Sequence, residues 1–187
     1  MAGLQFIPLA AMLAIIAATL LRGIAVRRGT GDRPWAFASA KGVQRVAGVC
    51  FASSAVVLLA ASVLARTGDS VTNGVAALLA MTGAGIVIVA QVQMGRAWRV
   101  GVRDGDAPLF VSHGLFRFSR NPIFVGMMLI GVGVGIVSAT WWGWAAFGVF
   151  VVACAVQVRI EEAHLETNFG ESFRDFRATV PRWLGWS

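Results

Sequence analysis

The sequence contains a long stretch without a single charged side chain, from Asn121 to Val158. As one helix, this stretch would extend about 57 Å, nearly twice the roughly 30 Å thickness of a bilayer's hydrocarbon core. Near its centre, residues 138–144 (SATWWGW) combine turn-forming residues with tryptophans that favour the membrane interface. The sequence therefore predicts two helices, 122–138 and 141–158, joined as a tight hairpin.

The whole chain has the composition of an integral membrane protein. Of its 187 residues, 57% are hydrophobic and 13% are charged, whereas a soluble domain carries about 25% charged residues. Three further uncharged runs are long enough to cross a bilayer, namely 4–21, 46–65 and 71–94. Basic residues follow the first run, so we expect it to be retained and not cleaved as a signal peptide. The sequence predicts an all-α membrane protein, a single domain over 1–187 with five transmembrane helices.

The basic residues predict how these helices are oriented. Fifteen of the 16 Lys and Arg side chains fall on one side of the membrane, in 22–45, 96–120 and 159–187. Because cytoplasmic loops are enriched in Lys and Arg, we expect an external N-terminus and a cytoplasmic C-terminus. The arginine-rich, alanine-rich composition suggests a bacterial chain, hence a multi-pass protein of the plasma (inner) membrane. The formal net charge of +7 is then a topology signal and not the basic patch of a nucleic-acid-binding protein.

A first polar segment lies in the predicted cytoplasmic loop 95–121, directly before the hairpin. It can simply start a helix, with Asn121 as N-cap, Pro122 in the first turn and arginines at the headgroups. Alternatively, the free N–H groups of the helix start, together with Arg117 and Arg120, form an anion-binding corner. Gly114 would then allow the backbone to approach a ligand closely.

A second polar segment opens the predicted cytoplasmic helical segment 159–187. It contains Glu161 and Glu162, and adjacent carboxylates near a membrane boundary are costly unless they are paired or solvated. They can face solvent, bridge to a loop arginine, or accept hydrogen bonds from ribose hydroxyls, an amino group or a sulfonium. Because the far ends of a hairpin meet, we expect both polar segments to form one pocket. An apolar helical stripe follows, with Gly170 as a break: Leu165, Phe169, Phe173, Phe176 and Val180.

The motifs of the two segments occur in a fixed order along the chain. They are Gly114-x-Phe-Arg117-x-x-Arg120-Asn-Pro-x-Phe124-x-Gly126, then Glu161-Glu162-x-x-Leu165, Phe169-Gly170, Phe173 and Val180-Pro181. This order, over residues 91–183, resembles the isoprenylcysteine carboxyl methyltransferase family and its phospholipid methyltransferase relatives.

The resemblance implies methyl transfer from S-adenosylmethionine to a lipidic or small apolar acceptor that enters from the surrounding membrane lipids. No nucleic acid is involved, and no metal is expected with two Cys and two His in the chain. Arg120 and Glu162 would be catalytic: Arg120 orients an anionic acceptor, or Glu162 assists an amine. The implied cofactor site comprises His113, Gly114, Leu115, Arg117, Asn121, Pro122, Phe124, Gly126, Glu161 and Glu162.

The chain departs from the family's pattern at several positions. Asn121 stands where the family usually has His, and Gln157 stands where Arg is frequent. Phe116, Phe124 and Phe173 stand where Tyr is usual. Because the chain has no tyrosine, no phenolic hydroxyl contributes to the site.

Two other functions are compatible with the sequence. One is an NADPH-dependent membrane reductase of the sterol or enone type, which can have a similar basic C-terminal region. The other is a non-catalytic membrane protein whose basic cytoplasmic face binds anionic lipid or a partner, at roughly 1 kcal/mol per surface arginine. Binding of S-adenosylhomocysteine, of NADPH or of neither separates the three possibilities.

The predicted orientation can be tested by labelling single cysteines with a membrane-impermeant maleimide after replacing Cys50 and Cys154. We expect Thr67→Cys to react in intact cells and Thr30→Cys to react only after permeabilisation, because the arginine-rich segments stay inside. The reverse pattern would overturn the orientation.

Overall fold

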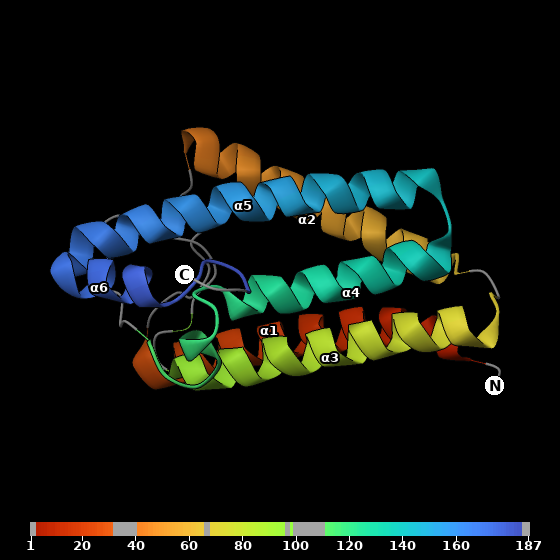
Figure 1. Cartoon of the computed structure of the whole chain (residues 1–187), viewed down its shortest axis with the longest axis horizontal. Helices are drawn as coiled ribbons and strands as arrows, with labels where there is room; N and C mark the ends of the chain where they lie inside the picture. The colour runs from red at the N-terminus through yellow and green to blue at the C-terminus, as the bar shows by residue number, and fades with distance from the viewer. Residues whose placement is uncertain (1–2, 32–40, 66–67, 96–97, 99–110, 185–187) are drawn as a thin grey trace.

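The computed structural model describes residues 3–31, 41–65, 68–95, 98 and 111–184. These residues form helices and no β-strand, which confirms the all-α prediction (Figure 1). Most of the predicted loop 95–121 lies outside the described residues. The elements in chain order are the 3-10 turn η1 (Leu4–Phe6), α1 (Ile7–Thr30), α2 (Gly42–Val63), α3 (Ser70–Met94), the 3-10 turn η4 (Gly114–Arg117), α4 (Pro122–Ser138), α5 (Trp141–Phe169) and α6 (Glu171–Thr179).

Four helices are long and apolar enough to cross a membrane: Leu4–Gly29, which joins η1 to α1, and α2, α3 and α5. The predicted spans 4–21, 46–65, 71–94 and 141–158 correspond to these helices. α4 is also apolar, but its 17 residues extend about 26 Å, at the short end of the range for a spanning helix. A fifth crossing over 122–138 therefore stays a prediction.

α5 continues well beyond the predicted end of its span at residue 158 and reaches Phe169. No glycine or proline interrupts the sequence between residues 149 and 169, so the backbone has no reason to leave the helix earlier. At Gly170 the backbone takes a φ of 53°, which glycine adopts without strain. As a result, Glu161 and Glu162 lie on the same rigid helix as the apolar span, and α6 begins only after this break.

α4 and α5 are joined by two residues, as the hairpin interpretation predicts (Figure 1). Ala139 ends α4 in the left-handed region with a φ of 48°. Thr140 is the N-cap of α5, and its hydroxyl oxygen accepts a hydrogen bond from the backbone N–H of Gly143 at 3.3 Å. The turn therefore makes the two helices run in opposite directions.

α4 packs against α3 through backbone contacts that only glycine permits. A Cβ atom on Gly126 would lie 2.6 Å from the carbonyl oxygen of Gly83. A Cβ on Gly83 would in turn lie 2.4 Å from the carbonyl oxygen of Gly126. Two helical turns later, a Cβ on Gly133 would lie 2.8 Å from the carbonyl oxygen of Ala76. Small residues at this seam let the two backbones approach closely, as in other membrane helix pairs.

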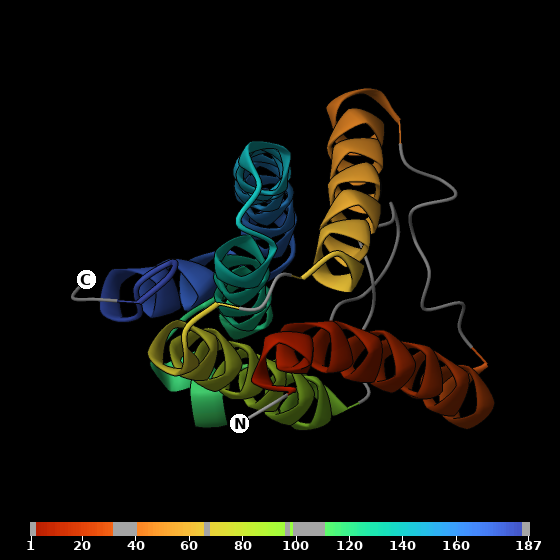
Figure 2. The same cartoon turned by 90° about the vertical axis from the view of Figure 1, so that its right-hand side faces the viewer.

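The other glycines of α4 face α5. A Cβ on Gly131 would meet the ring of Phe147 at 2.6 Å, and one on Gly135 would meet the ring of Trp144 at 2.9 Å. α4 thus presents glycine to two neighbours, α3 and α5, and lies between them (Figure 2).

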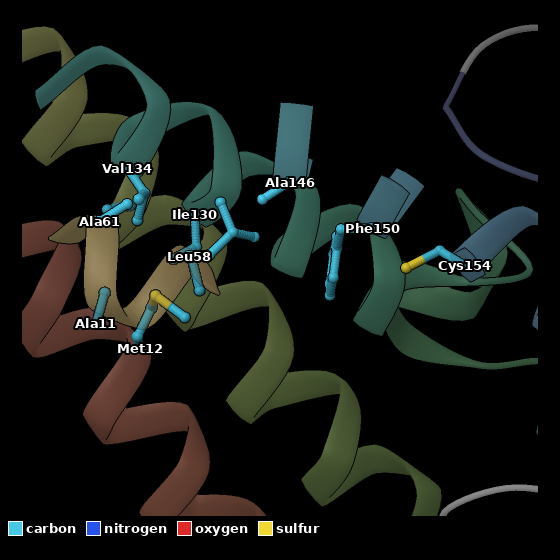
Figure 3. Packing of buried hydrophobic residues seen from close by; sticks show 10 residues of the cluster. Ala11, Met12, Leu58, Ala61, Ile130, Val134, Ala146, Phe150 and Cys154 are labelled. Carbon is cyan, nitrogen blue, oxygen red and sulfur yellow. The ribbon is translucent and has the colours of Figure 1, made fainter. Parts of the chain in front are cut away.

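α5 also packs against α2, where the rings of Phe51 and Phe150 lie 5.0 Å apart. This contact belongs to a buried apolar cluster to which α1 to α5 contribute (Figure 3). A polar contact within the bundle joins α1 to α3, since the side-chain amide of Gln91 donates to the Thr19 hydroxyl at 2.8 Å. The buried members of the cluster are Ala11, Met12, Leu58, Ala61, Ala80, Ile130, Val134, Ala146, Phe150 and Cys154.

The α3–α4 seam can be tested with two alanine substitutions. We expect Gly126→Ala to destabilise the protein by about 2 kcal/mol, because the added methyl group presses on the Gly83 backbone. Gly148→Ala is the matched control in α5, where nothing lies within 4 Å of the new Cβ and a helical Ala is favoured by roughly 0.5–1 kcal/mol. Thermal unfolding in detergent measures both changes, and equal effects would refute the seam.

Candidate functional site

A buried carboxylate, that of Glu162 in α5, is the centre of a polar network. Its side chain is 8% exposed and is paired with two arginines. Arg120, just before α4, donates through Nε to Oε1 at 3.1 Å. Arg182, after α6, donates from Nε to both oxygens and from Nη2 to Oε2 at 2.8 Å. Both oxygens of the Glu162 carboxylate therefore accept hydrogen bonds from arginines, which offset the cost of burying its charge.

Arg120 also holds the end of α6. Its Nη1 donates to the carbonyl oxygen of Arg177 at 2.9 Å and to that of Val180 at 2.7 Å. Its backbone N–H donates to the carbonyl oxygen of Pro181 at 2.9 Å. The last carbonyl groups of a helix have no partner within the helix, so Arg120 supplies donors that α6 and the following turn would otherwise lack.

The two residues that flank Arg120 fix the same C-terminal tail. The Ser119 hydroxyl donates to the carbonyl oxygen of Arg182 at 3.3 Å, and the Asn121 side chain donates to that oxygen at 3.1 Å. The Asn121 amide also contacts Oε1 of Glu162 at 3.4 Å. Although Asn121 occupies the N-cap position of α4, its side chain caps no helical N–H. Its side chain serves the Glu162 network instead.

Arg182 is the functional candidate that the sequence analysis missed. The predicted second arginine opposite the carboxylates is Arg117, but the side chain of Arg117 is exposed, and Arg182 occupies that place. Hydrogen bonding to the Glu162 carboxylate raises the pKa of the Arg182 guanidinium. The feature of the sequence that could have identified Arg182 is its position directly after the Val180-Pro181 motif.

Glu161 has a different environment from its neighbour. Its carboxylate accepts one hydrogen bond within the described residues, from Nε2 of Gln157 at 3.2 Å, one helical turn earlier on α5. No ion pair joins Glu161 to an arginine in the described part of the chain, because the nearby guanidinium groups are bonded to Glu162. The two adjacent glutamates are therefore not equivalent.

The η4 turn is held by α3. A Cβ atom on Gly114 would lie 2.4 Å from both Nε2 and Oε1 of Gln93. The backbone of Gly114 has a φ of 62°. The backbone N–H of Leu115 donates to Oε1 of Gln93 at 2.8 Å. The positive φ favours glycine at this position, and a side chain there would displace the Gln93 amide that holds the turn. His113, which precedes this turn, is exposed.

The predicted site residues therefore form three groups. Arg120 and Asn121 come together with Glu162 next to the C-terminal tail, whereas the adjacent Glu161 is hydrogen-bonded to Gln157. Figure 1 shows the start of α4, the end of α5 and α6 on the same side of the molecule. The η4 group is fixed to the end of α3. The remaining residues take part in helix packing at the start of α4: Pro122 is buried, Phe124 packs against the apolar cluster, and Gly126 faces α3.

Comparison with protein families matches residues 71–172 to the phospholipid methyltransferase family. The match covers more than half of the chain and includes α3, η4, α4 and α5, which carry both polar segments. The chain belongs to this family. It is a multi-pass membrane protein of a methyltransferase family. A search of curated proteins found no match.

The ion pairs of Glu162 and of Glu166 differ in burial and allow a matched test. We expect Glu162→Gln to lower the free energy of unfolding by about 3 kcal/mol, because it leaves the buried guanidinium group of Arg120 without its counter-charge. Glu166→Gln removes an exposed ion pair, in which the side chain of Arg177 is 45% exposed and that of Glu166 is 37% exposed. This variant is expected to lower the free energy of unfolding by less than about 1 kcal/mol. Thermal unfolding compares the variants, and similar losses would show that the Glu162 network does not hold the tail.

Proposed function

We propose that this protein is an integral membrane methyltransferase that transfers a methyl group from S-adenosylmethionine to a lipidic or small apolar acceptor. The observation that carries the proposal is the family match, because it covers the two polar segments whose residues meet at the Arg120–Glu162 pair. Methyl transfer needs alignment and exclusion of water, not a protein nucleophile. A site framed by rigid helices and a fixed tail suits that requirement.

The polar groups of the site fit S-adenosylmethionine. This molecule carries a cationic sulfonium, an ammonium group and ribose hydroxyls, and Glu161 offers a carboxylate with one hydrogen bond from the described residues. When bound, the cofactor supplies an electrophilic methyl group, whose carbon bonds to a lone pair of the acceptor while the C–S electrons stay on sulfur. We assign Glu161 to the cationic and hydroxyl groups of the cofactor. The other proposed cofactor residues are His113, Gly114, Leu115, Arg117, Asn121, Pro122 and Phe124, whereas Gly126 is assigned to helix packing.

Arg120 is the proposed catalytic residue, in contact with the acceptor. Its Nε and Nη1 are bonded to Glu162 and to the tail, while Nη2 has no hydrogen bond to a described residue. That nitrogen suits an anionic group of the acceptor, such as a carboxylate or phosphate. Glu162, with both oxygens bonded to arginines, is a positioning residue that orients Arg120. Its pairing with two cations disfavours proton removal from an amine.

The membrane arrangement is part of the proposal. With α4 as a fifth crossing and the N-terminus outside, the Arg120–Glu162 pair faces the cytoplasm of a bacterial inner membrane. Soluble cofactor then enters from the cytoplasm and a lipidic acceptor enters laterally between the helices.

Ligand binding by the detergent-solubilised protein tests the proposed activity. We expect S-adenosylhomocysteine to raise the melting temperature and NADPH to leave it unchanged, because only the former carries an ammonium group that can pair with Glu161. We expect Arg120→Ala to lower methyl transfer to lipid by about 100-fold or more, since a charged donor at the acceptor is lost. Arg159→Ala, at an exposed arginine of α5, is the control and should retain activity.

Two outcomes would contradict the proposal in different ways. If S-adenosylhomocysteine gives no stabilisation and no labelled methyl group reaches a lipid extract, the activity is wrong. If the wild type is active and Arg120→Ala behaves like Arg159→Ala, the activity stands and the role of Arg120 is wrong.

A further inference from the structure

The side chain of Gln157 leaves a buried oxygen without a partner. Gln157 is 4% exposed and lies on α5, one turn before Glu161. Its Nε2 donates to Oε1 of Glu161 at 3.2 Å. Its Oε1 is buried and accepts no hydrogen bond from any described residue. Burying a polar atom in this way is unfavourable unless something else satisfies it.

Three buried side-chain atoms of the described residues have no hydrogen-bond partner: Nε of Arg22, Oδ1 of Asn73 and Oε1 of Gln157. Gln91, which is 3% exposed, donates to Thr19 and leaves no buried atom without a partner. The buried hydroxyls of Ser54 and Ser62 donate to carbonyl oxygens of their own helix. Of the three atoms without a partner, only the Gln157 oxygen lies on α5, one helical turn from Glu161; Asn73 lies in the first turn of α3, and Arg22 lies on α1.

The neighbouring carboxylate defines the chemistry that would satisfy this oxygen. Gln157 Oε1 and the Glu161 carboxylate are both acceptors and lie one helical turn apart. The arginines of the nearby network are bonded to Glu162 and not to Glu161. Two acceptor groups, one of them a carboxyl group without an arginine partner among the described residues, suit a ligand group with N–H or O–H donors. They disfavour a carboxylate or phosphate, whose oxygens would be repelled.

We propose that the buried Gln157 and the partly buried Glu161 form a subsite for a donor group of the ligand, an ammonium, amine or hydroxyl, and that Gln157 is a specificity-determining residue. The inference rests on the proposed methyltransferase function. The donor group can belong to S-adenosylmethionine, through its ammonium or ribose hydroxyls, or to the methyl acceptor, through an amine or hydroxyl. Both sources share one chemistry, and binding measurements distinguish them.

The test compares the same substitution at two buried glutamines, Gln157→Leu and Gln91→Leu, in the full-length protein in detergent. Each variant loses one hydrogen bond from Nε2, but only Gln157→Leu also removes the oxygen without a partner. Without ligand, we therefore expect Gln157→Leu to lower the melting temperature less than Gln91→Leu does. The probes are S-adenosylhomocysteine, measured by titration calorimetry, and phosphatidylethanolamine in mixed micelles as an amine-bearing methyl acceptor.

We expect Gln157→Leu to weaken one of these interactions by about tenfold or more, because the ligand's donor loses its buried acceptor. Weaker binding of S-adenosylhomocysteine assigns the subsite to the cofactor. Unchanged binding with a raised KM for phosphatidylethanolamine and an unchanged kcat assigns it to the acceptor. Gln157→Met, a flexible apolar side chain of similar length, should reproduce the effect.

The proposal is overturned if Gln157→Leu leaves both interactions as they are in the wild type. It is also overturned if this variant and Gln157→Met lose as much stability as Gln91→Leu or fail to fold, because the amide would then serve the fold and not a ligand. Failure of the proposed function has a different signature: the wild type itself neither binds S-adenosylhomocysteine nor methylates lipid. The stability comparison then still decides whether the oxygen is structural.

Discussion

A carboxylate that is removed from water at the edge of an apolar bundle must be paired, and this requirement organises one end of the protein. Glu162 of α5 is the buried group, and its partners Arg120 and Arg182 come from before α4 and from after α6. One buried charge therefore fixes three segments of the chain. The backbone follows the same arrangement, since Arg120 also bonds carbonyl oxygens at the end of α6. The C-terminal tail is thus fixed to the start of α4 and to α5.

The position of the segment that contains Arg120 depends on how closely α4 can approach α3. The contact of Gly83 with Gly126 holds the start of α4 against α3, and Gln93 holds the η4 turn against the end of the same helix. The chain that follows α3 therefore returns to α3 before α4 begins. With α4 fixed on one side and α5 packed against α2 through Phe150, the Glu162 network joins two helices that each have another principal partner.

Two adjacent glutamates of identical chemistry acquire different roles from their surroundings. Glu162 is hydrogen-bonded through its two carboxylate oxygens to two guanidinium groups. Glu161 accepts a hydrogen bond from the amide of Gln157, whose other polar atom has no partner in the described residues. This difference separates the carboxylate that holds three segments of the chain together from the one that we propose to bind a donor group of the ligand.

The sequence by itself determined the helices, the break between α4 and α5, and the meeting of Arg120 with Glu162. Hydropathy, helix-ending glycine and the antiparallel course of a hairpin are local properties that residue order encodes. Only the tertiary structure showed that Arg182 is the second partner of Glu162 and that α4 packs closely on α3. It also showed that the buried oxygen of Gln157 lacks a partner. These features depend on how separate segments pack together and on which side-chain atoms then come within hydrogen-bond distance, which no local pattern specifies.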